Sequence, residues 1–335
     1  MNVPAVTVLM PVYNAEAYVA EAIESILGQT FTDFEFLIID DSSTDATPGI
    51  LERYTTRNSC IHVVRNEKNL NIGASLNRGL ELASAPLVAR MDADDVSLPH
   101  RLEKQVAFMA ANPDVVVAGG CWRGYETGII RKPPLTNDAI RATLLWTPPF
   151  CHPAVIMRRP PVLRAGGYRQ EYPPTEDYDL WRRLAAVPDL RFANLDEVLI
   201  RYREHPGIDR SAYRARQREL SATVSRAYLL DLGMREDELD MDAHAVFSGG
   251  APADALPTGR LQAWVARLIR LNGAKKICDP DVFASLCNER LHNSCVRAEW
   301  MPPGLKRLIP LPVKNCVKKC LFAFKNSKQT FTDEA

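Results

Sequence analysis

The sequence lacks the cysteine patterns that bind zinc or cross-link small secreted domains. Its eight cysteines are scattered along 335 residues, without a Cys-x-x-Cys pair or a Cys/His cluster at zinc-finger spacing. It also lacks any run of the roughly 18 apolar residues that a membrane-spanning helix needs. Residues 3–12 are apolar but follow no basic segment, unlike a signal peptide. These absences predict reduced thiols and a cytoplasmic protein, either free or held at the cytoplasmic face of a membrane.

The sequence carries no net charge, because 41 basic residues balance 41 acidic ones. The charges are unevenly spread, since residues 1–100 contain 14 acidic and only 6 basic residues. An acidic N-terminal part argues against a nucleic-acid partner there and suits a site that gathers metal cations.

The first 120 residues alternate between strand and helix patterns. Apolar runs rich in β-branched residues predict strands at residues 6–10, 34–40, 62–65, 87–91 and 115–118. Helical spacing and capping residues predict helices at residues 17–28, 46–54, 73–83 and 99–111. This alternation predicts an α/β fold with a mostly parallel sheet flanked by helices.

The remainder of the chain changes character near residue 205. Prolines divide residues 121–205 into short pieces, which include a helical pattern at 175–186 and a strand pattern at 198–203. Beyond them the pattern is mainly helical, with helices predicted at residues 211–232, 259–271 and 281–293. Residues 249–257 are predicted to be a linker. We therefore expect a mainly helical C-terminal extension over residues 206–335.

Three polar clusters follow predicted strands, at residues 13–14, 40–42 and 92–95. Ligands of parallel α/β sheets bind outside the carboxyl ends of the strands, so we expect these clusters to meet at one site. Strand alternation directs Asp92 and Asp94 to the same side. Paired carboxylates suit Mg²⁺ or Mn²⁺, which take further ligands from water and substrate phosphates.

Four motifs occur in a fixed order along this part of the chain. They are VLMPVYN at residues 8–14, IDDSSTD at 39–45, NLNIGASLNRG at 69–79 and MDADD at 91–95. In this order and spacing they resemble the family-2 glycosyltransferases, over about residues 4–205.

The resemblance implies a GT-A catalytic domain over residues 1–205. Its nucleotide-sugar-binding half would be residues 1–120, and its acceptor-side half residues 121–205. It further implies an inverting enzyme that transfers a sugar from a nucleoside diphosphate, with a UDP-sugar favoured. The acceptor would be a hydroxyl of a glycan or of a lipid-linked glycan, as in cell-surface polysaccharide synthesis.

The donor-binding residues follow from the matched motifs. By resemblance, Pro11, Tyr13 and Glu16 would line the pocket for the base and ribose, with Tyr13 as one wall. Asp41 would accept the N3–H of a uracil-type base, and Asp92 would reach the ribose.

The metal ligands follow from the same resemblance. Asp94 would be the main ligand of Mg²⁺ or Mn²⁺. His205 lies in a segment that resembles the family's Tyr-Arg-x-His motif, where it would contact the metal or diphosphate, or else be structural. Asp95 either joins the acidic cluster or caps the helix that follows.

The chain departs from the family pattern after His205, where Ile208 and Asp209 replace the usual serines, and within the third motif. Leu76 stands where relatives often carry an arginine. Arg78 or Arg65 would supply the missing charge to the donor, or no residue supplies it.

A second acidic motif, TEDYDLW, occupies residues 175–181. It resembles the family segment whose aspartate is the catalytic base, which is Asp177 here, with Glu176 and Gly167 on the acceptor side. Trp181 follows one helical turn after Asp177 and would stack on an acceptor sugar or belong to the core. The alternative is that the acidic residues only stabilise the start of a helix.

Residues 301–328 contain seven basic residues and no acidic one. Their apolar residues recur at helical spacing, which predicts a basic amphipathic helix. Such a helix either contacts a membrane surface peripherally or packs on the catalytic domain.

Two other function classes remain open from the sequence alone. A sugar-phosphate nucleotidyltransferase would need a glycine-rich basic loop after the first strand, where this chain has Pro-Val-Tyr-Asn. A non-catalytic carbohydrate-binding module would have lost acidic site residues, yet Asp41, Asp92, Asp94 and Asp177 are present.

Overall fold

The computed structural model describes residues 3–204, 211–252 and 255–297. His205 and the basic segment 301–328 lie outside this part of the chain, so their predicted roles stay predictions. Among the described residues, no helix combines the length and apolar character required to cross a bilayer.

The chain forms two compact units, Met1–Glu236 and Asp237–Ala335. The family resemblance ends near residue 205, but the first unit continues beyond it. Helix α8 (Ser211–Asp231) belongs to this unit because it packs on α7 (Glu176–Ala185).

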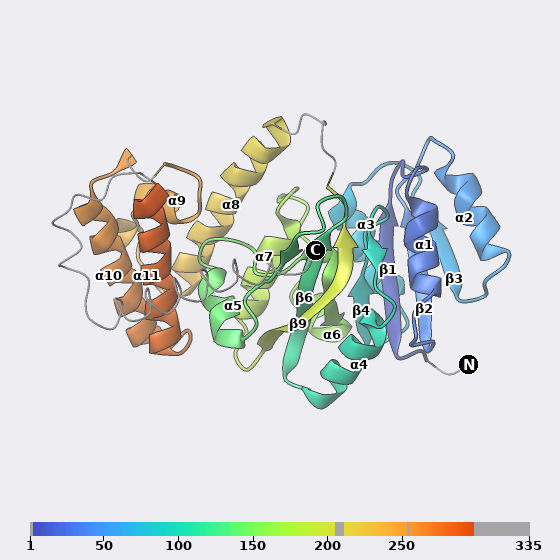
Figure 1. The fold of residues 1–335 in the computed structure, drawn as a ribbon, viewed down its shortest axis with the longest axis horizontal. Helices are drawn as coiled ribbons and strands as arrows, with labels where there is room; N and C mark the ends of the chain where they lie inside the picture. Colours follow the sequence, from blue (N-terminus) through green and yellow to red (C-terminus); the bar gives the residue numbers. More distant parts are fainter. Residues whose placement is uncertain (1–2, 205–210, 253–254, 298–335) are drawn as a thin grey trace, which may run out of the picture. The chain divides into compact units, whose positions relative to one another are not determined.

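A nine-stranded sheet forms the centre of the first unit (Figure 1). The strands are β1 (Val6–Val12), β2 (Phe34–Asp40), β3 (Ile61–Arg65), β4 (Leu87–Arg90), β5 (Val96–Ser97), β6 (Val115–Gly124), β7 (Ile130–Arg131), β8 (Ile156–Arg158) and β9 (Arg191–Tyr202). Their order is β3-β2-β1-β4-β8-β6-β9-β5, with β7 beside β6.

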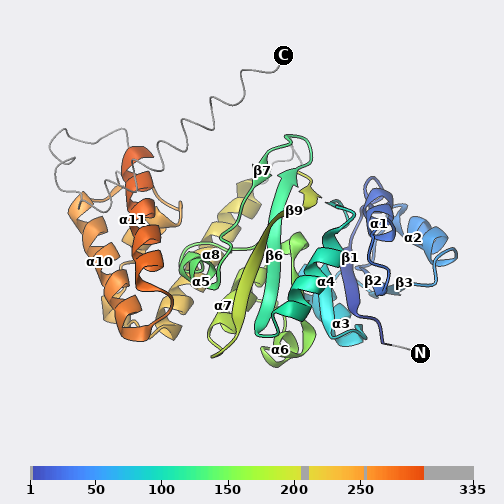
Figure 2. The ribbon, with the colours of Figure 1, turned by 60° about the horizontal axis from the view of Figure 1, so that its bottom comes forward.

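The sheet is parallel in its N-terminal half and mixed beyond it. β1 runs parallel to β2 and β4, and β2 runs parallel to β3, as the sequence predicts. β8 runs antiparallel to both β4 and β6. The long strands β6 and β9 lie side by side and parallel (Figure 2).

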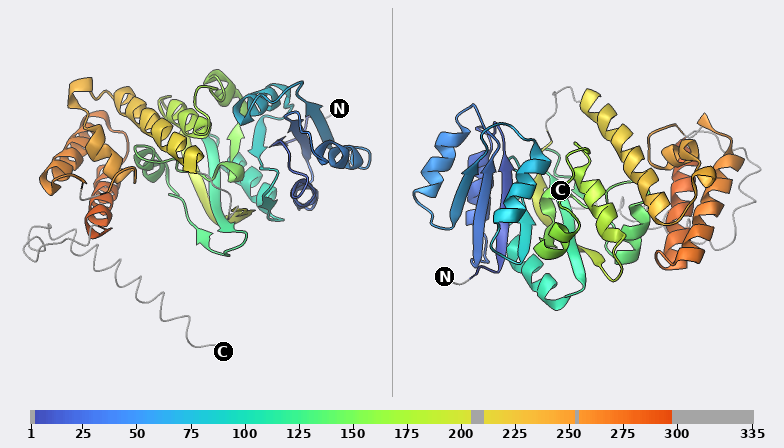
Figure 3. Two further views of the ribbon diagram at one scale, coloured as in Figure 1. Left: turned by 90° about the horizontal axis from the view of Figure 1, so that it is seen from above. Right: turned by 180° about the vertical axis from the view of Figure 1, so that it is seen from behind.

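Helices cover both faces of the sheet. In the first unit they are α1 (Val19–Leu27), α2 (Thr47–Thr55), α3 (Ile72–Leu82), α4 (Arg101–Ala111), α5 (Asn137–Thr143), α6 (Arg159–Arg164), α7 and α8, with the short 3-10 helix η1 (His152–Ala154). Val8 and Met10 of β1 pack in one core with residues of α1, α2 and α4. On the other face, Leu9 lies against Gly79 of α3. The right panel of Figure 3 shows α3 and α6, which touch each other, in front of the sheet.

Parallel pairing brings the carboxyl ends of β1, β2 and β4 to one edge. β1 and β2 end in register, with Val12 opposite Asp40. Just past the strand ends, the amide of Asp41 donates to the carbonyl of Val12 at 2.8 Å, and that of Met91 to Leu9 at 3.0 Å. The segments after all three strands therefore start at the same edge, as the sequence predicts.

The second unit is helical in its described residues. After η2 (Glu236–Glu238) at the junction come α9 (Met241–Phe247), α10 (Thr258–Lys275) and α11 (Pro280–Arg297). α10 packs on α9 and α11, and Trp264 of α10 meets the ring of His244 edge-on at 5.7 Å.

Candidate active site

A cluster of three carboxylates follows β4. Asp92, Asp94 and Asp95 each offer an oxygen, and these oxygens all lie within 4.8 Å of one another. Asp95 is buried, and its Oδ1 accepts the backbone N–H of Arg203 at 2.7 Å. Because α4 begins only at Arg101, the prediction that Asp95 caps the following helix is wrong.

Arg90 is a positively charged partner of this cluster. The buried guanidinium of Arg90 donates to Asp92 through two nitrogens. Burial raises the pKa of Asp92, the charge of Arg90 lowers it, and the charge of Asp94 raises it again. The pKa of Asp95 lies well above its usual range, because the carboxyl is buried and faces the charges of Asp92 and Asp94.

These properties fit a hard divalent cation. Within the described residues, the buried Oδ2 of Asp95 has no hydrogen-bond partner. Three mutually repelling carboxylates with such an unsatisfied oxygen match the all-oxygen ligand sets of Mg²⁺ and Mn²⁺. Asp92, Asp94 and Asp95 are therefore the residues of the described chain that would hold such an ion.

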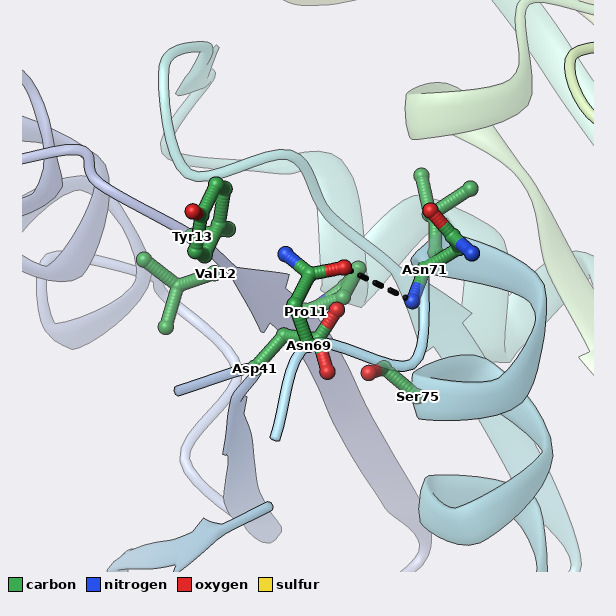
Figure 4. A pocket seen from close by; sticks show the side chains of 8 residues that line it. Pro11, Val12, Tyr13, Asp41, Asn69, Asn71 and Ser75 are labelled. Atoms are coloured by element: carbon green, nitrogen blue, oxygen red, sulfur yellow. Dashed lines mark hydrogen bonds between the residues drawn. The ribbon is translucent and has the colours of Figure 1, made fainter. Parts of the chain in front are cut away.

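A pocket of about 250 Å³ opens at the ends of β1 and β2 (Figure 4). Its lining residues are Pro11, Val12, Tyr13, Asp41, Asn69, Asn71, Ile72 and Ser75. In Figure 4, Tyr13 and Asn71 stand on either side of the pocket, with Asp41 and Ser75 below them. The side chain of Tyr13 is 49% exposed, which leaves a ring face available to a ligand.

Three of the six residues predicted for the donor site line this pocket, whereas Glu16, Arg78 and Asp92 do not. Pro11, Tyr13 and Asp41 line it. Glu16 does not, because its Oε2 accepts the amide of Ala46 at 2.8 Å at the start of α2. Glu16 therefore supports the loop between β2 and α2.

Neither candidate arginine is directed at the pocket. Arg65 forms an ion pair with Asp40 and donates to the carbonyl of Ser43 at 2.8 Å. Arg78 donates to the carbonyl of Arg65 at 2.9 Å and to the side-chain oxygen of Asn66. Arg78 is thus held by Arg65 and Asn66 and does not line the pocket, and its predicted contact with the donor stays a prediction.

The second acidic pair lies at the start of α7. Burial raises the pKa of Asp177, while the amide of Tyr178, which donates to its Oδ1 at 2.8 Å, and the positive charge of Arg90 lower it. Burial and the charge of Asp177 raise the pKa of Glu176 to about 7. Glu176 is thus only about half ionised near neutral pH.

Two predicted acceptor-side residues have a structural role. Trp181 is completely buried and lies edge-on to Phe150 and His152, at ring distances of 5.4 and 6.0 Å. It belongs to the core and presents no face to a sugar. Gly167 has a φ of +60°, and a Cβ there would lie 2.3 Å from Oδ1 of Asn77. The close approach that this glycine permits is to Asn77.

Comparison with known proteins identifies the family. Residues 7–167 match the model of glycosyl transferase family 2. An uncharacterized glycosyltransferase of Haemophilus influenzae is 34% identical over 244 residues, which cover 67% of this chain and 73% of that protein. The chain belongs to glycosyltransferase family 2. The putative glycosyltransferase EpsE of Bacillus subtilis is similar at 35% identity, over 71% of this chain and 84% of EpsE.

A further relative of this glycosyltransferase has a named reaction. The UDP-Gal:alpha-D-GlcNAc-diphosphoundecaprenol beta-1,3-galactosyltransferase of Escherichia coli is 32% identical over 206 residues, covering 59% of this chain and 74% of that enzyme.

Solved structures show the same fold. Staphylococcus aureus TarS 1–349 in complex with UDP-GlcNAc superposes with a TM-score of 0.55 at 19% identity, covering 86% of this chain and 92% of that one. The mannosyltransferase PcManGT of Pyrobaculum calidifontis in complex with GDP-Man and Mn²⁺ gives 0.55 at 19%, covering 90% and 88%. The expected GT-A fold is therefore confirmed.

Sequence reasoning missed three side chains of this glycosyltransferase site. Arg90 interrupts an otherwise apolar strand, which is a signal for a buried ion pair. Asn66 and Ser75 are buried polar residues that contact each other at 2.9 Å, but nothing in their local sequence predicts that contact.

Proposed function

We propose that this glycosyltransferase transfers a sugar, with inversion, from a UDP-sugar to a hydroxyl of a glycan or lipid-linked acceptor. The observation that carries the proposal is that two acidic sites come from different parts of the fold. The carboxylate cluster after β4 and the pocket lie at the ends of parallel strands, whereas Asp177 comes from α7. A donor site and a separate base are the two parts that inverting transfer requires.

The pocket would take the nucleoside. Tyr13 would stack on the base, Pro11 would pack beside it, and Asp41 would accept an N–H from the base. Each carboxylate oxygen of Asp92 has a second lone pair that Arg90 does not use, and these lone pairs would accept hydrogen bonds from the ribose hydroxyls.

Asp94 would be the main ligand of Mg²⁺ or Mn²⁺, with Asp92 and Asp95 beside it. A divalent ion bound there would neutralise the charge of the departing nucleoside diphosphate. Because that leaving group is stable, the protein need not supply a general acid.

Asp177 would remove the proton from the acceptor hydroxyl. Its partial burial makes it a stronger base than an exposed aspartate, because its pKa is raised. Glu176, with a pKa of about 7, would be about half protonated at neutral pH and so limit the repulsion on Asp177. Attack from the side opposite the diphosphate would invert the anomeric centre.

The names of relatives support the substrate classes. One relative uses UDP-Gal and a diphosphoundecaprenol-linked acceptor, and TarS binds UDP-GlcNAc. Other relatives are named for amylovoran and O-antigen biosynthesis. We therefore favour a role in cell-envelope polysaccharide synthesis, with residues 301–328 as a peripheral membrane contact. Family membership disfavours both the nucleotidyltransferase and the non-catalytic module.

A donor screen tests the proposal. The wild-type protein would be incubated with a panel of nucleotide sugars and Mn²⁺, and released nucleoside diphosphate would be measured. We expect slow release of UDP from at least one UDP-sugar. Release only from sugars linked to other nucleotides would contradict the choice of donor, and no release from any would contradict the function.

A further inference from the structure

Asn66 lies at the centre of a buried hydrogen-bond network beneath the pocket. It follows β3, and only 1% of its surface is exposed. Its Nδ2 donates to Oδ1 of Asp41 at 2.6 Å and to Oγ of Ser75 at 2.9 Å. Its Oδ1 accepts from Nη1 of Arg78. Every polar atom of this carboxamide is thus used within the protein.

Arg78 and Asp41 together fix the orientation of the Asn66 carboxamide. A guanidinium can only donate, so the atom facing Arg78 must be the amide oxygen. The amide nitrogen then faces Asp41 and Ser75, where it donates to both. Without Arg78 the amide oxygen would lose its charged donor, and the orientation of the carboxamide would depend on Asp41 and Ser75 alone.

This arrangement defines what the pocket offers to a ligand. Both hydrogen bonds that Asp41 accepts, from Asn66 and from the amide of Leu70 at 2.9 Å, end on Oδ1. Oδ2 is left as an acceptor for the pocket. Ser75 uses its oxygen as an acceptor for Asn66, and its O–H has no acceptor among the described residues. The pocket therefore presents an acceptor beside a donor.

We propose that Arg78 is a positioning residue for nucleobase selection, acting through Asn66 on Asp41 and Ser75. The acceptor–donor pair matches a base that has a ring N–H beside a carbonyl, as in uracil or guanine. Cytosine and adenine present the reverse order, a bare ring nitrogen beside an amino group. The inference rests on the proposed function, because it assumes that a nucleotide occupies this pocket.

The alternative role for Arg78 is to neutralise the phosphates of the donor. The two roles differ in which part of the ligand depends on Arg78. A phosphate contact affects UDP most, UMP less and uridine not at all. A contact that orders the base site affects all three by the same factor.

The test measures the affinities of uridine, UMP, UDP and CDP by calorimetry with Mn²⁺ present, with uridine in competition against UDP. Two variants change Arg78: Arg78→Met removes its N–H donors, and Arg78→Lys keeps a donor. A third, Asn66→Asp, keeps the shape of the side chain and its contact with Arg78 but removes the N–H donors of the amide. Lys68→Met is the matched control, because Lys68 is an exposed cation of the loop that carries Asn66 and leads into α3. Thermal unfolding of each variant checks the fold.

We expect Arg78→Met and Asn66→Asp to weaken uridine, UMP and UDP alike, by roughly tenfold, the effect of one hydrogen bond to a charged group. We also expect the preference for UDP over CDP to shrink in both, and Arg78→Lys to retain part of it. Lys68→Met should change neither quantity.

A loss that spares uridine and grows from UMP to UDP would overturn the inference and leave the proposed function intact. An equal loss in Lys68→Met, or an unchanged ratio of UDP to CDP affinity in Asn66→Asp, would overturn it as well. A wild-type protein that binds none of the four ligands would instead overturn the proposed function, and the inference with it.

Discussion

The two terminal nitrogens of Arg90 contact the two carboxylate oxygens of Asp92, with Nη1 2.7 Å from Oδ2 and Nη2 2.5 Å from Oδ1. This buried pair neutralises one of the three clustered carboxylates. Asp94 stands in the same cluster, and its carbonyl oxygen accepts from Arg203 Nε at 2.8 Å. Because Asp92 is paired with Arg90, we infer that Asp94 is the main ligand of a bound cation.

Replacing Asp94 by asparagine tests the metal assignment. Asp94→Asn should abolish the increase in UDP affinity that Mn²⁺ produces, because the ion loses its main anionic ligand. Since outer contacts alone change metal affinity by roughly 10–100-fold, the effect should be at least that large. Calorimetry with and without Mn²⁺ measures it. Asp33→Asn, at the opposite end of β2, is the control. An unchanged response to Mn²⁺ in Asp94→Asn would exclude Asp94 as the ligand.

Asp41→Asn tests the recognition of the base. An amide can present its N–H to a bare ring nitrogen, so the variant should lose UDP affinity by roughly tenfold and gain affinity for CDP. Equilibrium binding of the two nucleotides to both proteins gives the ratio. If the variant discriminates between UDP and CDP as well as the wild type, Asp41 does not read the base.

The raised pKa of Glu176 predicts a pH-dependent stability. The native protein holds the Glu176 proton up to about pH 7, whereas the unfolded chain releases it near 4.5. Because the native state binds the extra proton in this window, stability falls as pH rises from about 4.5 to 7. Glu176→Gln should remove this loss and be more stable above pH 7, by on the order of 2 kcal/mol. Urea unfolding of both proteins at pH 5 and 8 measures the difference. Parallel pH profiles would contradict the burial of a neutral Glu176.

Gly167 should tolerate no side chain. Asn77 accepts the amide of Tyr168 and donates to its carbonyl, both at 2.7 Å, so it cannot easily move away from a new Cβ. Gly167→Ala should lower the free energy of unfolding by roughly 3 kcal/mol through the clash and the left-handed backbone. Gly166→Ala, which has φ +86° and no atom near the added Cβ, should cost only about 1 kcal/mol. Equal losses in the two variants would show that the contact with Asn77 does not matter.

The N-terminal half of the fold was predictable because its signals are local. Strands such as β1 and β2 are long apolar runs, and parallel order follows from the intervening helices. Strands β5, β7 and β8 have only two or three residues and exist because of their partners, so no local pattern reveals them. β8 in particular is formed by insertion between β4 and β6.

The site was predictable to the extent that its chemistry lies in contiguous motifs. The acidic residues after β4 form one short motif, and those at the start of α7 form another. The structure brings Asp92, Asp94 and Asp95 of the first motif together. The role of Trp181 was not predictable, because helical spacing gives its direction but not the covering by Phe150. The role of Arg78 was not predictable either, because its contact with Asn66 depends on the packing of α3 beside β2.

The most direct test of the account is the turnover of Asp177→Asn with its best UDP-sugar donor and acceptor. If Asp177 is the base, kcat should fall by roughly 10²–10⁴-fold while donor affinity stays at the wild-type value. Glu171→Gln, an exposed acidic residue shortly before α7, should keep full activity. A fully active Asp177→Asn would contradict the account, as would a loss confined to donor affinity.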